Sequence, residues 1–274
     1  MKRNVQATGQ DQEERASISS ARPLPPPEHK AVYVQEMFGR IARRYDLMNR
    51  LMTLGRDRAW RRYTVSQLGL GSSSSNPQSR RVLDVATGTG DLALEALHQH
   101  PDASVAGLDF VPEMLTQAQQ KAATAGQTLG DEFGSPRLAL SAGDALRLPF
   151  TDAVFDGVVT GFALRNVTDI PAAFAEMARV TRAGGRVACL EIAKPRTFLF
   201  RQLFALYFYR LVPLLGGWIT GQRSAYTYLP HSLTAFLTRD EIAEVMRQTG
   251  WHSVTSKRLM LGTVAVHVGI KTGK

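Results

Sequence analysis

The sequence predicts an α/β fold in which a mainly parallel sheet carries helices on both faces and ends in an antiparallel hairpin. Short apolar runs alternate with helical patterns through the central part of the chain. One of these runs, at 81–86, leads into a loop that contains Gly88 and Gly90 and then into a helix. Near the end of the chain, two further runs at 253–260 and 263–270 are separated by a short turn, as in a hairpin.

The individual elements follow from apolar periodicity and from the residues that begin and end helices. Strands are expected at 81–86, 104–109, 137–141, 154–160 and 186–191, and helices at 91–99, 112–125, 171–182 and 241–248. Pro112 stands at an early position of its helix, and Gly126 follows the last turn of that helix. Thr238 and Glu241 have the spacing of a capping box. With the terminal hairpin, the sheet should contain seven strands.

The chain divides into a polar start and one folded domain. Residues 1–30 lack apolar periodicity and end in a proline-rich run, so we expect a disordered tail. Residues 31–274 are expected to form a single domain, since 44% of the residues are hydrophobic. Within it, 31–68 begins with a basic amphipathic pattern that predicts an N-terminal helical lid. Residues 69–79 are rich in serine and glycine, as in a loop.

The segment 195–235 is expected to be an apolar helical insertion. Its aromatic-rich stretch, 198–219, should form a helix that Pro213 ends, because proline lacks an N–H and clashes in a helix interior. Two interpretations stay open for this stretch, packing on the core or contact with a hydrophobic substrate or a membrane. The second would use an apolar wall and a set of basic residues. These are Phe198, Phe200, Leu203, Phe204, Tyr207 and Phe208, with Arg40, Arg43, Arg44, Arg201 and Arg210.

Charge and cysteine content narrow the function classes. The net charge of +9 suggests an anionic partner, either nucleic acid or anionic lipid. No run of eighteen residues is free of charge, so no standard transmembrane helix is expected, and the start of the chain has no signal-peptide pattern. The single cysteine, Cys189, lies in an apolar run, which favours a buried, inert thiol in a reducing cytoplasm.

The glycine loop predicts a nucleotide site, and acidic residues around it indicate which ligand is bound. Asp109 stands 21 residues after Gly88, where a ribose-binding acid is expected, and the loop also fits the dinucleotide pattern. Asp84 precedes the loop, where its carboxylate would repel a pyrophosphate but could face the ammonium group of S-adenosylmethionine. Asp144 follows the third strand and could reach an adenine edge. These acids favour S-adenosylmethionine over a dinucleotide.

Four motifs between about residues 32 and 272 carry a family resemblance. They are the segments 45–60, 161–167, 179–191 and 226–232, which include the elements Y-D-x-M-N and L-R-N. On these motifs the sequence resembles the quinone-pathway C-methyltransferases, the demethylmenaquinone and 2-methoxy-6-polyprenyl-benzoquinol methylases. The family usually has serine and histidine where this chain has Thr53 and Asp57, and many relatives have serine at Gly161. The glycine removes a hydroxyl that could contact the cofactor.

The resemblance implies a class I S-adenosylmethionine-dependent methyltransferase with a Rossmann-like fold. It would transfer a methyl group to a ring carbon of a prenylated quinol, most readily demethylmenaquinol, with 2-methoxy-6-polyprenyl-1,4-benzoquinol as the alternative. The expected cofactor-binding residues are Asp84, Gly88, Thr89, Asp109, Asp144 and Ala145. The expected location is the cytoplasm, with peripheral association at the inner face of the cell membrane.

Arg165 and Asn166 are the candidate catalytic residues. The sulfonium methyl is already activated, so no metal is expected, but the ring carbon attacks well only when an adjacent hydroxyl loses its proton. Arg165 follows the fourth strand and could stabilise the resulting oxyanion, while Asn166 could orient the ring. Arginine itself cannot act as the base. The alternative for Arg165 is a structural salt bridge, for example to Asp169.

Three other classes of protein are disfavoured. An NAD-dependent oxidoreductase would use the same loop, but Asp84 argues against it. A nucleic-acid methyltransferase would suit the charge, but residues 160–163 do not match the Asp/Asn-Pro-Pro-aromatic element of one large class of base methylases. A non-catalytic lipid-binding scaffold would not need every cofactor residue. The expected partners are therefore a prenylated quinol and a membrane surface but no nucleic acid, and a homo-oligomer stays open.

Overall fold

The computed structural model describes residues 25, 27–70, 80–127, 129–130, 137–195, 198–234 and 236–273. Most of the predicted disordered tail and of the predicted loop at 69–79 lies outside the described residues. Residues 27–30, which we assigned to the tail, instead begin a helix. This difference arises because their local sequence is polar, whereas the apolar face of the same helix starts only with Val34.

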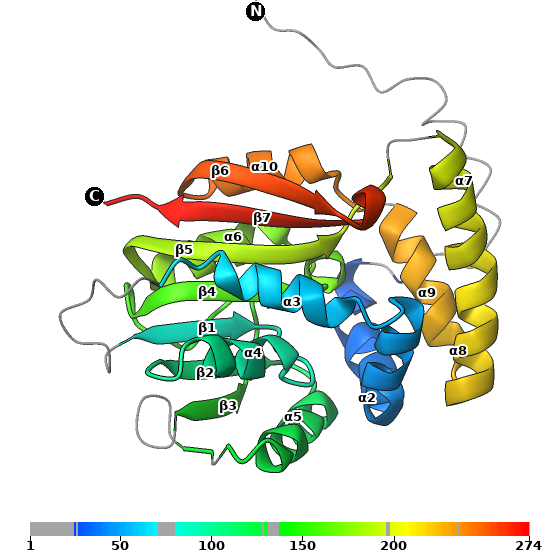
Figure 1. Ribbon diagram of the computed structural model, residues 1–274, viewed down its shortest axis with the longest axis horizontal. Coiled ribbons are helices and arrows are strands. Elements are labelled where there is room, and N and C mark those ends of the chain that lie inside the picture. The colour runs from blue at the N-terminus through cyan, green and yellow to red at the C-terminus, as the bar shows by residue number, and fades with distance from the viewer. Residues whose placement is uncertain are drawn as a thin grey trace, which may run out of the picture.

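A seven-stranded sheet forms the centre of the molecule (Figure 1). Its strands are β1 (Arg81–Val85), β2 (Ser104–Asp109), β3 (Leu138–Ala142), β4 (Phe155–Gly161), β5 (Thr181–Ile192), β6 (Trp251–Leu259) and β7 (Val264–Lys271), in the order β3-β2-β1-β4-β5-β7-β6. The first five strands are parallel, and β7 runs antiparallel to β5 and β6. The predicted seven-stranded sheet with a terminal hairpin is confirmed.

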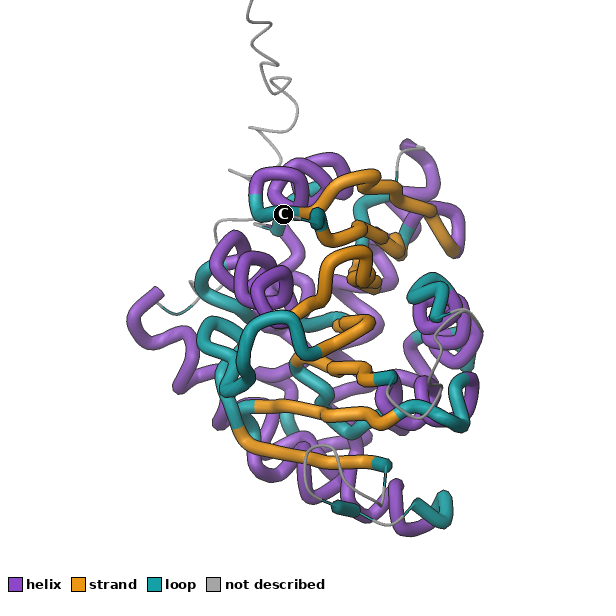
Figure 2. The backbone as a smooth tube through the Cα atoms, turned by 90° about the vertical axis from the view of Figure 1, so that its left-hand side faces the viewer, coloured by secondary structure: helices purple, strands orange, loops and turns teal. Residues whose placement is uncertain are grey.

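Helices cover both faces of this sheet (Figure 2). In Figure 1, α3 (Asp57–Ser66) and α4 (Asp91–Gln99) lie in front of the strands, while α6 (Ile170–Val180) and α10 (Arg239–Gln248) lie behind them. Helix α5 (Pro112–Thr124) packs on β2 and β3. The predicted capping box is present, since the Thr238 hydroxyl accepts from the Glu241 N–H and the Glu241 carboxylate accepts from the Thr238 N–H.

Further helices lie beyond the carboxyl ends of the parallel strands (Figure 1). Helix α2 (Pro27–Met52) packs against α5 on one side and against α8 (Val212–Thr220) and α9 (Arg223–Thr234) on the other. It buries Val34, Met37, Ile41 and Met48, which recur at helical spacing in the sequence. The helical structure expected for this segment is therefore present, and it stands over the edge of the sheet where loops follow strands.

The apolar stretch 198–219 is helical throughout, so the prediction that Pro213 ends its helix is wrong. Helix α7 (Phe198–Leu206) continues through a π-helical turn, η3 (Tyr207–Leu211), directly into α8. The π turn changes the hydrogen-bond pattern just before the proline. Pro213 consequently stands in the first turn of α8, where a missing N–H is tolerated.

Residues 198–220, which comprise α7, η3 and α8, form one continuous helical segment that we call the α7–α8 rod. This rod has one buried face and one exposed apolar face. Phe208 and Val212 are buried against the core. Leu206, Leu214 and Trp218 point away from it and are 63%, 58% and 86% exposed. The buried face agrees with packing on the core, whereas contact of the exposed face with a hydrophobic substrate or a membrane stays a prediction. The side chains of Phe198, Phe200 and Arg201, which we included in the apolar wall and the basic set, lie outside the described residues.

Cys189 lies in the middle of β5 and is fully buried. Burial raises the pKa of its thiol well above the ordinary value, and the nearby Glu191 carboxylate acts in the same direction. The thiol therefore stays protonated, as expected for an inert core cysteine.

Candidate active site

A cavity of about 520 Å³ lies at the carboxyl ends of the parallel strands, beside α2. Between β1 and β4 the strand order reverses, and ligands of open α/β sheets bind at such a switch point. The cavity brings together most of the residues predicted for the cofactor and one of the two predicted for catalysis. Its lining includes Gly88, Asp109, Asp144, Ala145 and Asn166, together with Tyr45, Ala86, Gly161 and Phe162.

Gly88 opens the loop toward this cavity. Its φ is +56°, and a Cβ added at this position would meet no atom within 4 Å. The first property favours glycine, and the second lets a ligand approach the backbone. Gly90 is also left-handed, with φ +82°, and is the N-cap residue just before α4. A Cβ added at Gly90 would lie 3.1 Å from the Ala118 Cβ of α5. The loop geometry thus agrees with the strand–loop–helix prediction.

Asp109 ends β2 and is held by the loops around it. Its Oδ2 accepts from the Gly88 N–H at 2.8 Å, and its Oδ1 accepts from the Val111 N–H at 2.9 Å. Burial raises the pKa of this carboxyl, although these backbone N–H groups oppose the shift. The side chain is only 6% exposed, and it borders the cavity, where each oxygen retains capacity for a further hydrogen bond.

Asp84 lies beneath the loop and does not line the cavity, so its predicted contact with an ammonium group stays a prediction. The residue is fully buried. Its Oδ2 accepts from the Thr87 hydroxyl at 2.6 Å and from the Ala93 N–H at 2.9 Å. Burial raises the pKa of its carboxyl to about 7, even though both hydrogen bonds lower it. Asp84 therefore ties the loop to α4, because its strand points it into the interior.

The other predicted cofactor residues border two different cavities. Asp144 and Ala145 border the cavity after β3, and Asp144 accepts from the Leu146 N–H at 2.9 Å. Thr89 does not border this cavity but a small neighbouring one. Its hydroxyl donates to Asp46 of α2 at 2.6 Å. No pattern in the sequence indicated this link between the loop and α2.

A second, largely apolar cavity of about 310 Å³ lies next to the first. Tyr45 and Phe162 border both, so they stand between the two cavities. Phe162 follows β4 with φ +57°, a conformation that non-glycine residues adopt at some cost. The apolar walls are Met52, Leu54, Trp60, Ile192, Leu203, Phe204, Tyr207, Phe208, Leu229, Met260 and Val264, drawn from α2, α3 and the α7–α9 segment among others.

Arg165 and Asn166 lie on the short helix η2 (Leu164–Asn166) that follows β4. Asn166 borders the first cavity and Arg165 the apolar one, so two neighbouring residues reach both cavities. The Arg165 Nη1 donates to the Phe162 carbonyl at 2.6 Å and lies 3.2 Å from Glu191 Oε1. The alternative partner that we considered, Asp169, instead caps α6 by accepting from the Ala172 N–H.

Glu191 is a site residue that our sequence reasoning missed. It lies near the end of β5, is 1% exposed, and forms a buried ion pair with Arg165. Burial raises the pKa of Glu191 to about 7, although the Arg165 guanidinium lowers it. An acid at the end of an apolar strand was the signal that identified Asp109, and the same signal was available here.

Comparison with known families identifies the chain. A model described as the ubiE/COQ5 methyltransferase family matches residues 27–271. The chain belongs to the ubiE/COQ5 methyltransferase family. This ubiE/COQ5 chain is 48% identical over 250 residues to a protein of Roseiflexus castenholzii named demethylmenaquinone methyltransferase, covering 91% of this chain and 98% of that one. It is 40% identical to a Geobacter protein named ubiquinone/menaquinone biosynthesis C-methyltransferase UbiE, covering 88% and 97%.

Solved structures show the same fold outside the ubiE/COQ5 family. The [4+2]-cyclase SpnF superimposes with a TM-score of 0.61 at 15% identity, over 88% of this chain and 96% of that one. An S-adenosylmethionine-dependent methyltransferase of Thermotoga maritima, described as a possible histamine N-methyltransferase, gives 0.59 at 15% identity, over 86% and 99%. Both the predicted family resemblance and the predicted fold class are confirmed.

Proposed function

We propose that this protein transfers the methyl group of S-adenosylmethionine to a ring carbon of demethylmenaquinol. The observation that carries the proposal is the pair of adjacent cavities, which meet at Tyr45 and Phe162. One has the glycine loop and acids suited to a nucleoside. The other has apolar walls and a few buried charged residues, namely Arg165, Arg61 and Asp57. This arrangement suits a methyl donor beside a prenylated ring, and the names of the relatives favour the naphthoquinol.

The residues of the first cavity fit S-adenosylmethionine. In the proposed arrangement, Asp109 accepts from the ribose hydroxyls, and Asp144 with the Ala145 N–H holds the adenine edge. Gly88 supports the fit, because the open space above it lets the backbone approach the ligand. When bound, the cofactor supplies a methyl group already activated by the sulfonium. The proposal therefore needs no metal.

Arg165 is proposed to stabilise the oxyanion of the quinol. Arg165 borders the apolar cavity and is only 6% exposed, and its guanidinium is anchored by Glu191 and by the Phe162 carbonyl. A fixed cation in a dry site stabilises developing negative charge more than it would in water. Asn166, which borders the first cavity, is proposed to orient the ring at the boundary between the two sites. Holding the ring carbon near the methyl group lowers the activation barrier further, because the two reacting groups are already oriented.

The enzyme is also proposed to meet its substrate at the inner surface of the cell membrane. No helix among the described residues has the length and apolar character needed to cross a bilayer. The apolar cavity is bordered by Leu54 and Leu203, which are 80% and 55% exposed, and the outer face of the α7–α8 rod is also apolar. These exposed side chains could contact lipid while the prenyl tail enters the cavity.

The basic residues that we assigned to this membrane contact point in different directions where their side chains are described, which leaves out Arg201. Arg40 and Arg43 line a groove between α2 and α5, and Arg40 lies 3.9 Å from Glu36. Arg44 donates to the Ile219 carbonyl. Their different directions follow from α2, which presents one side to α5 and another to α8. Arg40, Arg43, Arg44 and Arg210 are all exposed, and Arg210 is the one that lies on the rod itself.

The decisive experiment supplies methyl-labelled S-adenosylmethionine with reduced quinones. Label should appear in menaquinol when demethylmenaquinol is the acceptor, and an Arg165→Met variant should show little transfer. A parallel reaction with 2-methoxy-6-polyprenyl-1,4-benzoquinol distinguishes the alternative acceptor. Transfer only to the benzoquinol would replace the proposed substrate, and transfer to neither quinol would reject the proposed reaction.

A further inference from the structure

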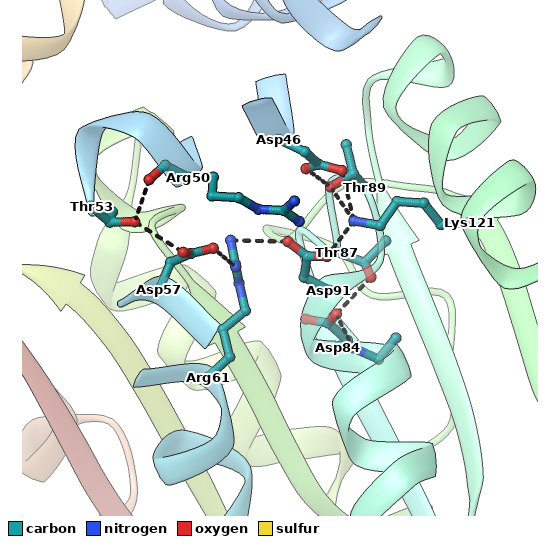
Figure 3. Close-up of polar contacts among 11 residues, drawn as sticks. Asp46, Arg50, Thr53, Asp57, Arg61, Asp84, Thr87, Thr89, Asp91 and Lys121 are labelled. Atoms are coloured by element: carbon teal, nitrogen blue, oxygen red, sulfur yellow. Dashed lines mark hydrogen bonds and ion pairs between the residues drawn. The ribbon is translucent and has the colours of Figure 1, made fainter. Parts of the chain in front are cut away.

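A cluster of charged side chains joins four helices at the glycine loop (Figure 3). Arg61 of α3 contacts Asp57 and lies 3.0 Å from Asp91, the first residue of α4. Lys121 of α5 contacts the other Asp91 oxygen and lies 2.8 Å from Asp46 of α2. These residues come from parts of the chain that are far apart in sequence, and the loop lies between them.

Two members of the cluster also border a small cavity of about 40 Å³. Arg61 and Asp91 line it together with Thr89. This cavity shares further lining residues with the large cofactor cavity, namely Tyr45, Ala86, Gly88, Gly161 and Phe162. The two spaces therefore adjoin, and the cluster presents a cation and an anion to the end of the cofactor cavity.

The strand order shows which end this is. Asp144 follows β3, Asp109 ends β2, and Gly88 follows β1, so the proposed adenine and ribose positions run along the sheet edge toward β1. The small cavity continues in the same direction, since its lining includes Gly161 of β4 and Leu190 of β5. A nucleoside placed on the acids would direct its 5′ substituent toward Arg61 and Asp91.

Both groups keep their charges in this position. Burial disfavours the charged form of Arg61, but Asp91 and Asp57 outweigh it, and the pKa of the guanidinium is raised above its ordinary value. Burial likewise opposes ionisation of Asp91, but Arg61 and Lys121 lower the pKa of its carboxyl below the ordinary range. A fixed cation beside a fixed anion is complementary to a zwitterion.

We propose that Arg61 and Asp91 bind the methionine end of S-adenosylmethionine, Arg61 its carboxylate and Asp91 its ammonium group. The assignment rests on the proposed function, because it uses the proposed orientation of the nucleoside. It gives the methionine ammonium a carboxylate partner on α4, since Asp84 lies beneath the loop. The same contacts would couple cofactor binding to α3 and, through Lys121 and Asp46, to α2.

The test compares two ligands that differ only at the proposed contact. S-adenosylhomocysteine carries the amino-acid end, whereas 5′-methylthioadenosine has the same nucleoside and sulfur without it. By calorimetry, the wild-type protein should bind S-adenosylhomocysteine about 10- to 100-fold more tightly, as expected for charge-assisted contacts. Arg61→Met and Asp91→Asn should each remove most of this difference and leave the affinity for 5′-methylthioadenosine nearly unchanged.

Matched variants separate this effect from general damage. Arg62→Met changes the neighbouring arginine, whose side chain is 72% exposed, and should preserve the wild-type ratio of affinities. Asp109→Ala should weaken both ligands, because both contain the ribose. Arg61→Lys keeps the cation and should retain part of the preference if Arg61→Met proves unstable.

Three outcomes would overturn the inference. Equal affinity of the wild-type protein for both ligands would show that the amino-acid end is not recognised. A ratio unchanged in Arg61→Met, with the protein folded, would limit Arg61 to a structural ion pair. Failure of the wild-type protein to bind either ligand would reject the proposed function as well, whereas normal binding without methyl transfer to a quinol would leave this inference intact.

Discussion

The buried pair of Arg165 and Glu191 gives the apolar cavity a cation whose position is fixed by its surroundings. The guanidinium Nη1 donates both to the Phe162 carbonyl and to the Glu191 carboxylate. A buried ion pair contributes little net stability, because desolvation offsets much of the attraction. The ion pair instead holds a positive charge beside the proposed quinol ring before the reaction begins.

Arg165→Met should lower kcat by about 100- to 1,000-fold, the usual effect of removing one group that stabilises an oxyanion. S-adenosylmethionine affinity should stay normal, since Arg165 does not border the cofactor cavity. Single-turnover kinetics and calorimetry measure the two quantities, with Arg165→Lys as the variant that keeps a charge. A near-normal kcat would assign Arg165 a structural role.

Glu191→Gln should change how stability depends on pH. The pKa of Glu191 rises from 4.5 to about 7 on folding, so the folded state binds more protons between these values. This contribution to stability is fully present below pH 4.5 and is lost as the pH rises through about 7. Between pH 4.5 and 8, the free energy of unfolding measured with urea should therefore fall less for the variant than for the wild-type protein. Asp84, whose pKa is also raised, is present in both proteins and cancels in the comparison. Parallel curves would contradict the assignment.

The contact between β4 and α4 explains why Gly161 suits this chain. A Cβ at position 161 would lie 2.8 Å from Leu92 Cδ1, closer than real side chains approach one another. Leu92 is buried in the packing of α4 on the sheet, so its end can move only a little.

Gly161→Ser should lower the free energy of unfolding by about 1–3 kcal/mol, as overpacking usually does. Combining it with Leu92→Val should recover part of that loss, because the shorter side chain leaves room for the new Cβ. Urea unfolding of the two single variants and the double variant gives the interaction energy. Strict additivity of the two losses would show that the Leu92 contact is not the cause.

The α7–α8 rod serves the apolar cavity with one face. Phe204 and Phe208 border the cavity, with ring centroids 5.1 Å apart in a stacked arrangement. Leu206 is on the same helix but outside the cavity lining, so it provides a control at a similar distance from the site.

Phe204→Ala should raise KM for long-tailed quinols more than for short-tailed ones, because only a long tail reaches this wall. The KM for the long-tailed quinol should rise about 10- to 100-fold, since burying an aromatic side chain contributes roughly 1.5–3 kcal/mol. Leu206→Ala should leave both KM values close to wild type. If Phe204→Ala affects the two substrates equally, the cavity does not hold the tail.

The net charge of +9 and the exposed apolar face of the rod support the proposed contact with a membrane. Lysine and arginine near an anionic surface each contribute about 1 kcal/mol, and salt screens this term. Leu214 and Trp218 are exposed and could enter the interface without being needed for the core.

Vesicles of anionic lipid should therefore bind the protein in a salt-sensitive way, as sedimentation can measure. Leu214→Ser with Trp218→Ser should weaken this binding while leaving the melting temperature and the KM of short-tailed quinols unchanged. Neutral vesicles serve as the reference. Binding that neither salt nor the double substitution alters would contradict a peripheral contact through this face.

The residue pattern alone was sufficient to predict the sheet and the glycine loop, and it placed several candidate site residues at the edge where the cavity lies. Strands β1 and β2 and helix α4 were predicted within one residue of their ends, because burial on a sheet leaves a continuous apolar run. Asp109 and Asp144 were predicted because they lie at or just after the ends of such runs. The carboxyl ends of parallel strands meet at one edge, and both residues border the cavity there. These features depend on neighbours in the sequence and on a general rule of topology.

Chain packing determined the partners of the charged residues. Arg165 pairs with Glu191, 26 residues away, rather than with nearby Asp169, because parallel pairing of β4 and β5 brings the ends of both strands together. Lys121 reaches Asp46 across 75 residues because α5 packs on α2. Periodicity shows which face of an element is buried, but the atoms that meet a buried charge depend on which elements become neighbours in the folded chain.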